Sequence, residues 1–293
     1  MRTKLELIGL MVWTCLVATS GIRAASVADY NVVWDSPSQN SSESMPCGGG
    51  DMGLNVWVED GDVLFYISRS GSLNELNEYV KLGRVRLRLD PNPFGMKDAT
   101  FRQELALREG CVQIRGSASG HDVSLRVWVE VHRPVVHVEV ESGQEINVTA
   151  TYENWRMTEE ILPNDTRRHA CFELLAFPGE LRLTPDHVAH ADGGVLFYHR
   201  NPADNWLRGL QIKQQGLQEF REEIPDDLSN RSFGGFLTGN GFQAAGETEG
   251  VYQTRSYKGW RLRSEKPARL HHLRVITHIA QEEKLEKWQQ DLD

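Results

Sequence analysis

Three short segments of the chain place an aromatic ring beside polar side chains. The segments are Tyr152–Arg156, Tyr198–Asn201 and Asp204–Trp206. A sugar ring has hydroxyl groups at its edge and C–H bonds on its face, so an aromatic side chain with a few polar donors suits it. The carbohydrate-contact candidates from these segments are Trp155, Arg156, His199, Arg200 and Asn201. The alternative, that the segments are ordinary strand ends packed on a neighbour, is equally open.

Carboxylates are plentiful, but their spacing selects no catalytic pair. Glycosidases use two carboxyl groups about 5–10 Å apart across the scissile bond. Glu153, Glu159, Glu160 and Asp204 lie in predicted loops or at strand ends, and the sequence does not say which of them meet. We therefore assign no catalytic residue.

The ten histidines form no metal-binding motif. His187 and His190 are separated by two residues, His271 and His272 are adjacent, and no HExxH is present. Histidines on alternating strands are more often core or surface residues than zinc ligands. We therefore predict neither a metal centre nor another cofactor.

The segment Gly48–Gly53 formally matches the dinucleotide motif GxGxxG. That motif works only between a strand and a helix, because the helix N-terminus binds the pyrophosphate. Here Leu54–Val58 alternates as a strand, and 36–46 upstream is predicted to be a loop. The glycines therefore indicate a tight turn, with positive φ, that leads into a strand.

Apolar side chains recur with a period of two from residue 30 to residue 280. In Gly83–Leu89 three aliphatic residues alternate with three arginines, and Asp122–Val131 repeats the pattern. Successive side chains of a strand face opposite sides of a sheet, so this spacing predicts half-buried antiparallel strands. Glu59–Asp62 between two such runs predicts a hairpin. The fold class is therefore all-β, a large two-sheet antiparallel sandwich.

The C-terminus changes to a helical period. In Gln281–Asp293, Leu285, Trp288 and Leu292 lie on one face, among charged residues. Such a stripe either folds back on the sandwich or binds another chain. We predict the second outcome, which makes these three residues partner-interface candidates.

Composition and the N-terminus exclude several classes of protein. The 293 residues are 40% hydrophobic and carry a net charge of −9, with no basic block for nucleic acid.

The first residues predict a signal peptide over 1–24, because they contain the basic residues Arg2 and Lys4, the apolar run Leu7–Ala18 and small residues near Ala24. An uncleaved N-terminal anchor is the alternative. No later segment has the about 20 apolar residues that cross a bilayer, so we expect a secreted or periplasmic protein.

Three cysteines follow the predicted signal peptide: Cys47, Cys111 and Cys171. The number is odd and no CxxC pair exists, so a full disulfide framework is excluded. We interpret all three as structural residues, with one bridge and one free thiol left as the alternative.

Several segments in order resemble one family. They are Trp34–Ser38, Ser44–Trp57, Leu64–Ile67, Lys81–Arg86, Pro91–Phe94, Phe101–Leu105, His199–Asn201 and Phe233–Gly235. They resemble an uncharacterised bacterial N-terminal domain family that precedes six-hairpin glycosidase modules. That family is related to the N-terminal domain of family 95 α-L-fucosidase-like glycoside hydrolases. Cys47-Gly48-Gly49 departs from it, because the family has an apolar residue followed by Gly-Asn-Gly.

The resemblance implies a galactose-mutarotase-like β-supersandwich over 25–280, with the start of a linker helix over 281–293. It also implies that the catalytic carboxylates belong to an (α/α)6 barrel that is missing here or separately encoded. Asp51 and Asn55, in and after the glycine turn, join the carbohydrate-contact candidates.

The leading hypothesis for function is an exported sandwich domain of a glycoside-hydrolase-like protein that is non-catalytic alone and contacts carbohydrate. The alternatives are a stand-alone enzyme of mutarotase or lyase type, and a purely structural interaction domain.

Overall fold

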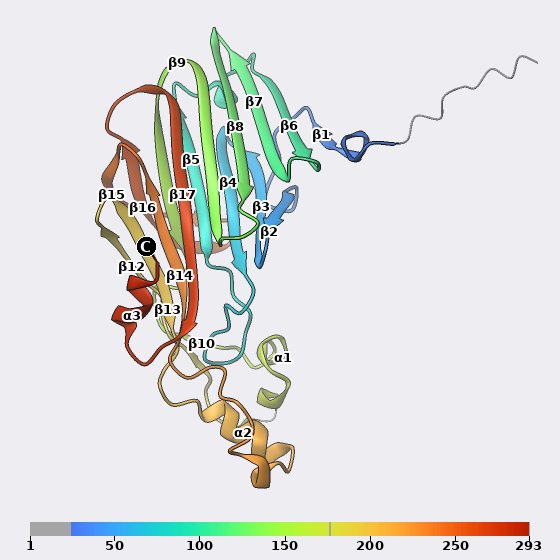
Figure 1. Cartoon of the computed structure of the whole chain (residues 1–293), viewed down its shortest axis with the longest axis vertical. Coiled ribbons are helices and arrows are strands. Elements are labelled where there is room, and N and C mark those ends of the chain that lie inside the picture. Colours follow the sequence, from blue (N-terminus) through green and yellow to red (C-terminus); the bar gives the residue numbers. More distant parts are fainter. Residues whose placement is uncertain (1–24, 176, 293) are drawn as a thin grey trace, which may run out of the picture.

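Two packed layers of antiparallel strands make up most of the chain (Figure 1). The computed structural model describes residues 25–175 and 177–292. From edge to edge, the first layer contains β1 (Val32–Trp34), β6 (Thr100–Ala106), β7 (Cys111–Ala118), β8 (His121–Val129), β9 (Val135–Asn154), β17 (Ala268–Gln281), β14 (Arg231–Gly239), β13 (Gly194–Arg200) and β12 (His187–Ala191). The second contains β15 (Phe242–Tyr252), β16 (Arg255–Ser264), β9, β5 (Gly83–Asp90), β4 (Asp62–Arg69), β3 (Met52–Glu59) and β2 (Met45–Gly49). The predicted antiparallel all-β sandwich is confirmed.

Strand β9 belongs to both layers. Residues 136–142 pair with β8, and residues 147–154 pair with β5. The partner strands on the other side are β17 for the first half and β16 for the second. A register shift between Ala268 and Leu270 of β17 lies at this crossing, as expected where a strand bends from one sheet into another.

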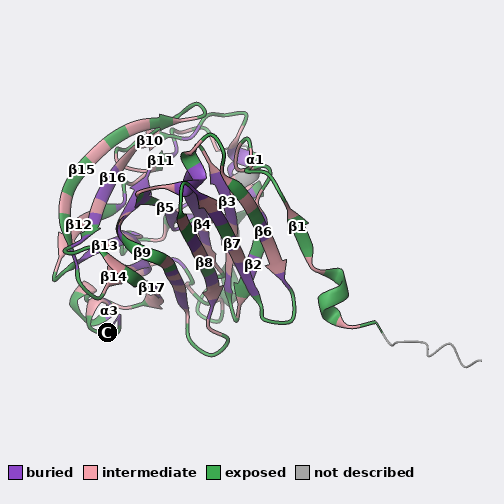
Figure 2. Cartoon of the chain, turned by 90° about the horizontal axis from the view of Figure 1, so that it is seen from above, coloured by how far each residue is buried: buried purple, intermediate pink, exposed green. Residues whose placement is uncertain are grey.

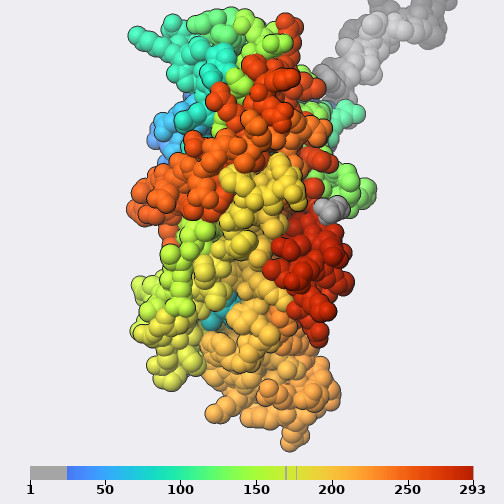
Figure 3. Space-filling model, turned by 90° about the vertical axis from the view of Figure 1, so that its left-hand side faces the viewer, coloured from blue at the N-terminus to red at the C-terminus, as the bar shows by residue number. Residues whose placement is uncertain are grey.

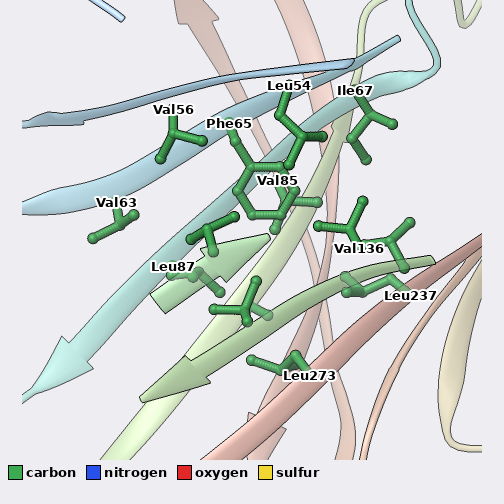
Figure 4. Close-up of a cluster of buried hydrophobic side chains, with 14 of the residues drawn as sticks. Leu54, Val56, Val63, Phe65, Ile67, Val85, Leu87, Val136, Leu237 and Leu273 are labelled. Carbon is green, nitrogen blue, oxygen red and sulfur yellow. The ribbon is translucent and has the colours of Figure 1, made fainter. Parts of the chain in front are cut away.

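The core fills the space between the two layers. Figure 4 shows Leu54, Phe65 and Val85 of the second layer meeting Val136 and Leu273 of the first. Viewed from above, buried segments alternate with exposed ones along the strands (Figure 2). This is the burial that the period-two pattern predicts, because one face of each strand must leave water.

Tight turns close the hairpins where the sequence predicts them. Between β3 and β4, Asp60 and Gly61 have φ of 52° and 81°, which is the type I′ geometry that matches strand twist. The formal GxGxxG segment is the hairpin of β2 and β3, with Gly50 at φ 58°. No helix follows it, so the structure confirms that this segment is a turn.

Residues 162–175, 177–181 and 201–230 interrupt the period-two alternation that dominates the chain from 30 to 280. They contain α1 (Arg167–Ala170), α2 (Trp206–Gln214) and the 3₁₀ turns Phe172–Leu174 and Gln218–Phe220. The short strands β10 (Glu160–Ile161) and β11 (Arg182–Leu183) pair beside them. A small second core supports this part: Leu76, Leu162, Cys171, Leu174, Leu181, Leu207 and Leu228. We call it the helical lobe; it lies at the lower end of Figure 1.

The C-terminal helix α3 (Leu285–Gln290) folds back onto the sandwich. Trp288 is fully buried against Tyr198 and His278, at ring distances of 5.5 and 5.9 Å, and Leu292 is buried as well. In Figure 3 this red segment lies against the yellow strands of the first layer. The prediction that the stripe stays open to another chain is wrong, because burying an indole is worth several kcal/mol. The helix is also shorter than predicted.

The three predicted structural cysteines are buried, and each has a free thiol. Burial raises the pKa of the Cys47 thiol to about 11, which makes it unreactive at neutral pH. The predicted signal peptide over 1–24 lies outside the described residues. Within those residues, no helix is both long and apolar enough to span a membrane.

Candidate functional site

A groove of about 740 Å³ lies between the end of the β15–β16 hairpin and the segment that follows β9. Its lining residues are Trp155, Met157, Thr158, Glu160, Glu249, Gly250, Val251, Thr254, Arg255, Ser256, Tyr257 and Lys258. Two aromatic side chains, Trp155 and Tyr257, are half-buried in it. Both carboxylates and cations stand around these rings, so the groove combines apolar faces with hydrogen-bonding groups. We call it the Trp155 groove.

Packing holds the two aromatic rings in place. The ring of Trp155 meets Tyr66 of β4 edge to face, with centroids 5.9 Å apart. Tyr257 lies opposite Gly250 in the hairpin register. A Cβ at Gly250 would come within 2.6 Å of the Tyr257 hydroxyl oxygen, so only glycine lets this ring lie flat on the neighbouring strand.

Next to the groove, the outer face of the second layer carries an ionic cluster in which Arg84, Glu153 and Asp62 are buried. The Nε of Arg84 lies 2.5 Å from Glu153, and the Nε of Arg86 lies 2.6 Å from the other oxygen of the same carboxylate. Arg86 and Arg88 also bind Asp62, at 3.0 and 2.8 Å. The ring of Tyr252 covers the guanidinium of Arg84 at 3.9 Å. Glu153 is therefore a structural carboxylate, since two arginines occupy it.

A second buried network lies where the helical lobe joins the sandwich. Nδ1 of His199 is 2.9 Å from Asp186, and Nε2 is 2.9 Å from Glu75. Asp186 also accepts hydrogen bonds from Asn154 at 2.7 Å and from Arg156 at 2.5 Å. Two cations thus face two carboxylates, and the network has no surplus charge.

The pKa values in this network follow from its geometry. Burial alone would lower the pKa of His199, but the hydrogen bonds to Asp186 and Glu75 raise this pKa to about 9. Burial alone would raise the pKa of Asp186, but the charge of Arg156 and the hydrogen bond with His199 lower this pKa overall. Because His199 stays protonated and buried at neutral pH, it links the segments that carry Asp186 and Glu75. It is therefore a structural residue and not a base in an open site.

The structure separates the predicted carbohydrate-contact residues. Trp155 lines the groove. Arg156, beside it, bridges to the buried network instead, and its guanidinium lies 5.7 Å from the Trp155 ring. His199 and Asn201 are 3% and 2% exposed. Because both side chains are buried, they are poorly placed to contact a carbohydrate.

The remaining candidates lie elsewhere. Arg200 donates to the carbonyl oxygens of Glu282 and Glu283 at 2.9 Å each, which holds the segment leading into α3. Asp51, in the turn of the β2–β3 hairpin, pairs with Arg69 at the end of β4. Asn55 lies on β3 opposite Tyr66, on the face that carries the aromatic rings. Asp204-Asn205-Trp206 is the start of α2, where Asn205 caps the helix by accepting from the Arg208 N–H.

Sequence reasoning missed the hairpin side of the groove. Tyr257, Lys258, Arg255 and Glu249 come from β15 and β16, about a hundred residues after Trp155. Two tyrosines on either side of the β15–β16 turn, Tyr252 and Tyr257, were the available signal. Nothing in the sequence showed that this hairpin would bend toward the end of β9.

Two carboxylates, Glu160 and Glu249, line the Trp155 groove from opposite sides. Arg255 lies 3.3 Å from Glu160, and both side chains remain exposed. In the described part of the chain, no three His, Cys, Asp or Glu side chains are grouped so that they could hold a metal ion. The groove can therefore stack a ring and form hydrogen bonds with its own side chains.

Residues 33–293 match the N-terminal part of a family described as a domain of unknown function, DUF5703. The chain belongs to this family. The match confirms the resemblance to an uncharacterised N-terminal domain family, whereas the relation to family 95 hydrolases stays a prediction. No curated protein matches the chain. The DUF5703 match includes the Trp155 groove, both buried networks and α3.

Proposed function

We propose that this DUF5703 domain is an exported, non-catalytic β-sandwich that contacts carbohydrate through the Trp155 groove. The single observation that carries the proposal is the pair of half-buried rings, Trp155 and Tyr257, in a groove flanked by charged side chains. Aromatic faces cover the C–H side of a sugar ring, while the flanking groups bind its hydroxyls.

The wider biological setting is also part of the proposal. The resemblance to sandwich domains that precede (α/α)6 glycosidase barrels, including those of family 95, supports a role in polysaccharide degradation. The catalytic carboxylates would then belong to a barrel partner and not to this domain. Because Trp288 is buried, such a barrel would dock on another surface than the apolar side of α3. A signal peptide over 1–24 would direct the protein to the periplasm or the exterior.

A binding experiment tests the groove directly. The purified chain is titrated with a panel of neutral and acidic polysaccharides by calorimetry, and Trp155→Ala is compared with Trp206→Ala. Trp206 is a matched control, because it is a tryptophan with 38% exposure outside the groove, on the helical lobe. Truncating a tryptophan that stacks on a ligand weakens binding about tenfold or more.

The expected result is binding of at least one glycan, lost in Trp155→Ala and retained in Trp206→Ala. Binding of no glycan by the wild type, or equal binding by Trp155→Ala, would refute the proposal.

The enzymatic alternative has one observation in its favour, since Glu160 and Glu249 line the same groove. Glycan turnover by the purified chain that disappears in Glu160→Gln and in Glu249→Gln would replace the binding function with a catalytic one.

A further inference from the structure

Four charged side chains line the Trp155 groove: Glu160, Glu249, Arg255 and Lys258. Every sugar presents hydroxyl groups, but some classes also carry a carboxylate and others an ammonium group. Which class the groove accepts depends on which of the four side chains are still free to pair with such a group. A preference of this kind rests on the proposed carbohydrate function and makes it more specific.

Both cations of the groove already have carboxylate partners. Nη1 of Arg255 lies 3.3 Å from each oxygen of Glu160. Nζ of Lys258 lies 2.7 Å from Glu247, the residue of β15 that lies two positions before Glu249. An acidic sugar therefore competes with a carboxylate that is already in place, which reduces the gain from a new ion pair.

Glu249 is the charged side chain of the groove that stays available. In the hairpin register it lies opposite Lys258, but the ammonium group of Lys258 is directed to Glu247 instead. Glu249 is exposed, and among the residues that the structure describes its carboxylate has neither an ion pair nor a hydrogen bond. An ionised carboxylate only accepts hydrogen bonds. It therefore receives a hydroxyl or an ammonium group and repels a second carboxylate.

Other cations near the groove do not offset this charge. Arg84 and Arg156 lie 5.2 and 5.7 Å from the two groove rings, and a buried carboxylate holds each guanidinium. Lys81 covers a tyrosine ring of β4 and does not line the groove. The lining side chains and their partners comprise three carboxylates and two cations, so one negative charge is in excess.

We propose that the Trp155 groove binds neutral or amine-bearing sugars in preference to uronic acids, and that Glu249 sets this selectivity. The faces of Trp155 and Tyr257 suit sugar rings of any charge and add an attraction for an ammonium group. The carboxylate of Glu249 distinguishes the charge. One unit charge several ångströms away in water changes the affinity for a charged group about two- to threefold, and salt screens the effect.

Collisional quenching of tryptophan fluorescence tests the charge of the groove without any glycan. Iodide, caesium and acrylamide are the anionic, cationic and neutral probes, and a Trp155→Phe variant in each background isolates the signal of Trp155. In Glu249→Gln we expect iodide to quench Trp155 about two- to threefold more strongly than in the wild type, caesium to quench it less, and acrylamide to quench it equally.

Glu265→Gln is the matched control. It removes one negative charge from an exposed residue between β16 and β17, outside the groove lining. It should leave the quenching of Trp155 unchanged by all three probes. Melting temperatures verify that every variant is folded.

Calorimetry with three oligosaccharides that share one backbone tests the selectivity itself. Cellopentaose is neutral, the chitosan pentamer carries amino groups, and cellopentaose oxidised at its primary hydroxyls carries carboxylates. We expect the wild type to bind the amino and neutral forms more tightly than the acidic form. Glu249→Gln should bring the neutral and acidic forms to about equal affinity, and Glu249→Lys should favour the acidic form.

Quenching that is the same in Glu249→Gln and in Glu265→Gln, tightest binding of the acidic form by the wild type, or binding of none of the three oligosaccharides would each overturn the selectivity. The proposed function fails on a different result: no glycan of the wider panel binds, or Trp155→Ala binds like the wild type.

Discussion

The buried histidine network predicts how the stability of the domain depends on pH. In the folded chain the pKa of His199 is about 9, against the ordinary 6.5. A folded-state pKa above the unfolded value means that the stabilisation is fully present below pH 6.5 and is lost as the pH rises through 9. Each pKa unit is worth about 1.36 kcal/mol, so the two values correspond to about 3 kcal/mol.

The perturbation is His199→Gln, which retains a polar side chain and removes the titrating group. Below pH 6.5 we expect the variant to be less stable by about 3–5 kcal/mol, because Glu75 and Asp186 then face no histidine cation. Between pH 6 and pH 10 this difference should shrink by about 3 kcal/mol, since the wild type loses its proton and the variant has none to lose.

The assay is urea unfolding followed by tryptophan fluorescence at intervals from pH 6 to pH 10, for both proteins. His187→Gln is the control, because this exposed histidine lies on the neighbouring strand. Its free energy of unfolding should stay within about 0.5 kcal/mol of the wild type at every pH. A constant difference between wild type and His199→Gln over the whole range would refute the reasoning.

Three further predictions concern other parts of the chain. Trp288→Ala should leave a monomer and lower the free energy of unfolding by about 3–5 kcal/mol, measured by denaturant unfolding and sedimentation, because this indole is fully buried; unchanged stability would contradict the fold-back of α3. Glu153→Gln should cost about 3–5 kcal/mol in the same assay, since it leaves the buried Arg84 without its carboxylate. Its control Glu159→Gln, in an exposed pair with Arg182, should cost less than about 1 kcal/mol, and equal costs for the two would argue against the buried cluster. Secreted protein should begin between Ala25 and Asp29 when its N-terminus is sequenced, and an intact Met1 would exclude cleavage.

Local pattern predicted the strands well. The alternation in Gly83–Leu89 corresponds to β5, and the signal at Glu59–Asp62 corresponds to a type I′ turn. Both depend on properties of neighbouring residues: the period of a strand and the φ angles that a turn requires. Asn205 shows the limit of this reasoning, because its role as a helix cap depended on the helix that follows it.

Charged residues on strands were harder to interpret. The arginines that alternate with Val85 and Leu87 lie on the opposite side of the strand from these aliphatic residues, and Arg88 is exposed. Arg84 is nevertheless 2% exposed, because Tyr252 covers it from a hairpin that is more than 160 residues later. Burial of a charge depends on what covers it, and that information lies in distant segments.

The sequence by itself therefore determined the class of fold, the strand faces and the turns, because each depends on side-chain period and backbone preference over a few residues. It also marked Trp155 as a carbohydrate-contact candidate. Only the tertiary structure decided that Trp155 meets the hairpin ring Tyr257, that His199 is enclosed between Glu75 and Asp186, and that Trp288 is covered by its own sandwich. These outcomes depend on contacts between residues far apart in the chain, which form only when the two layers pack.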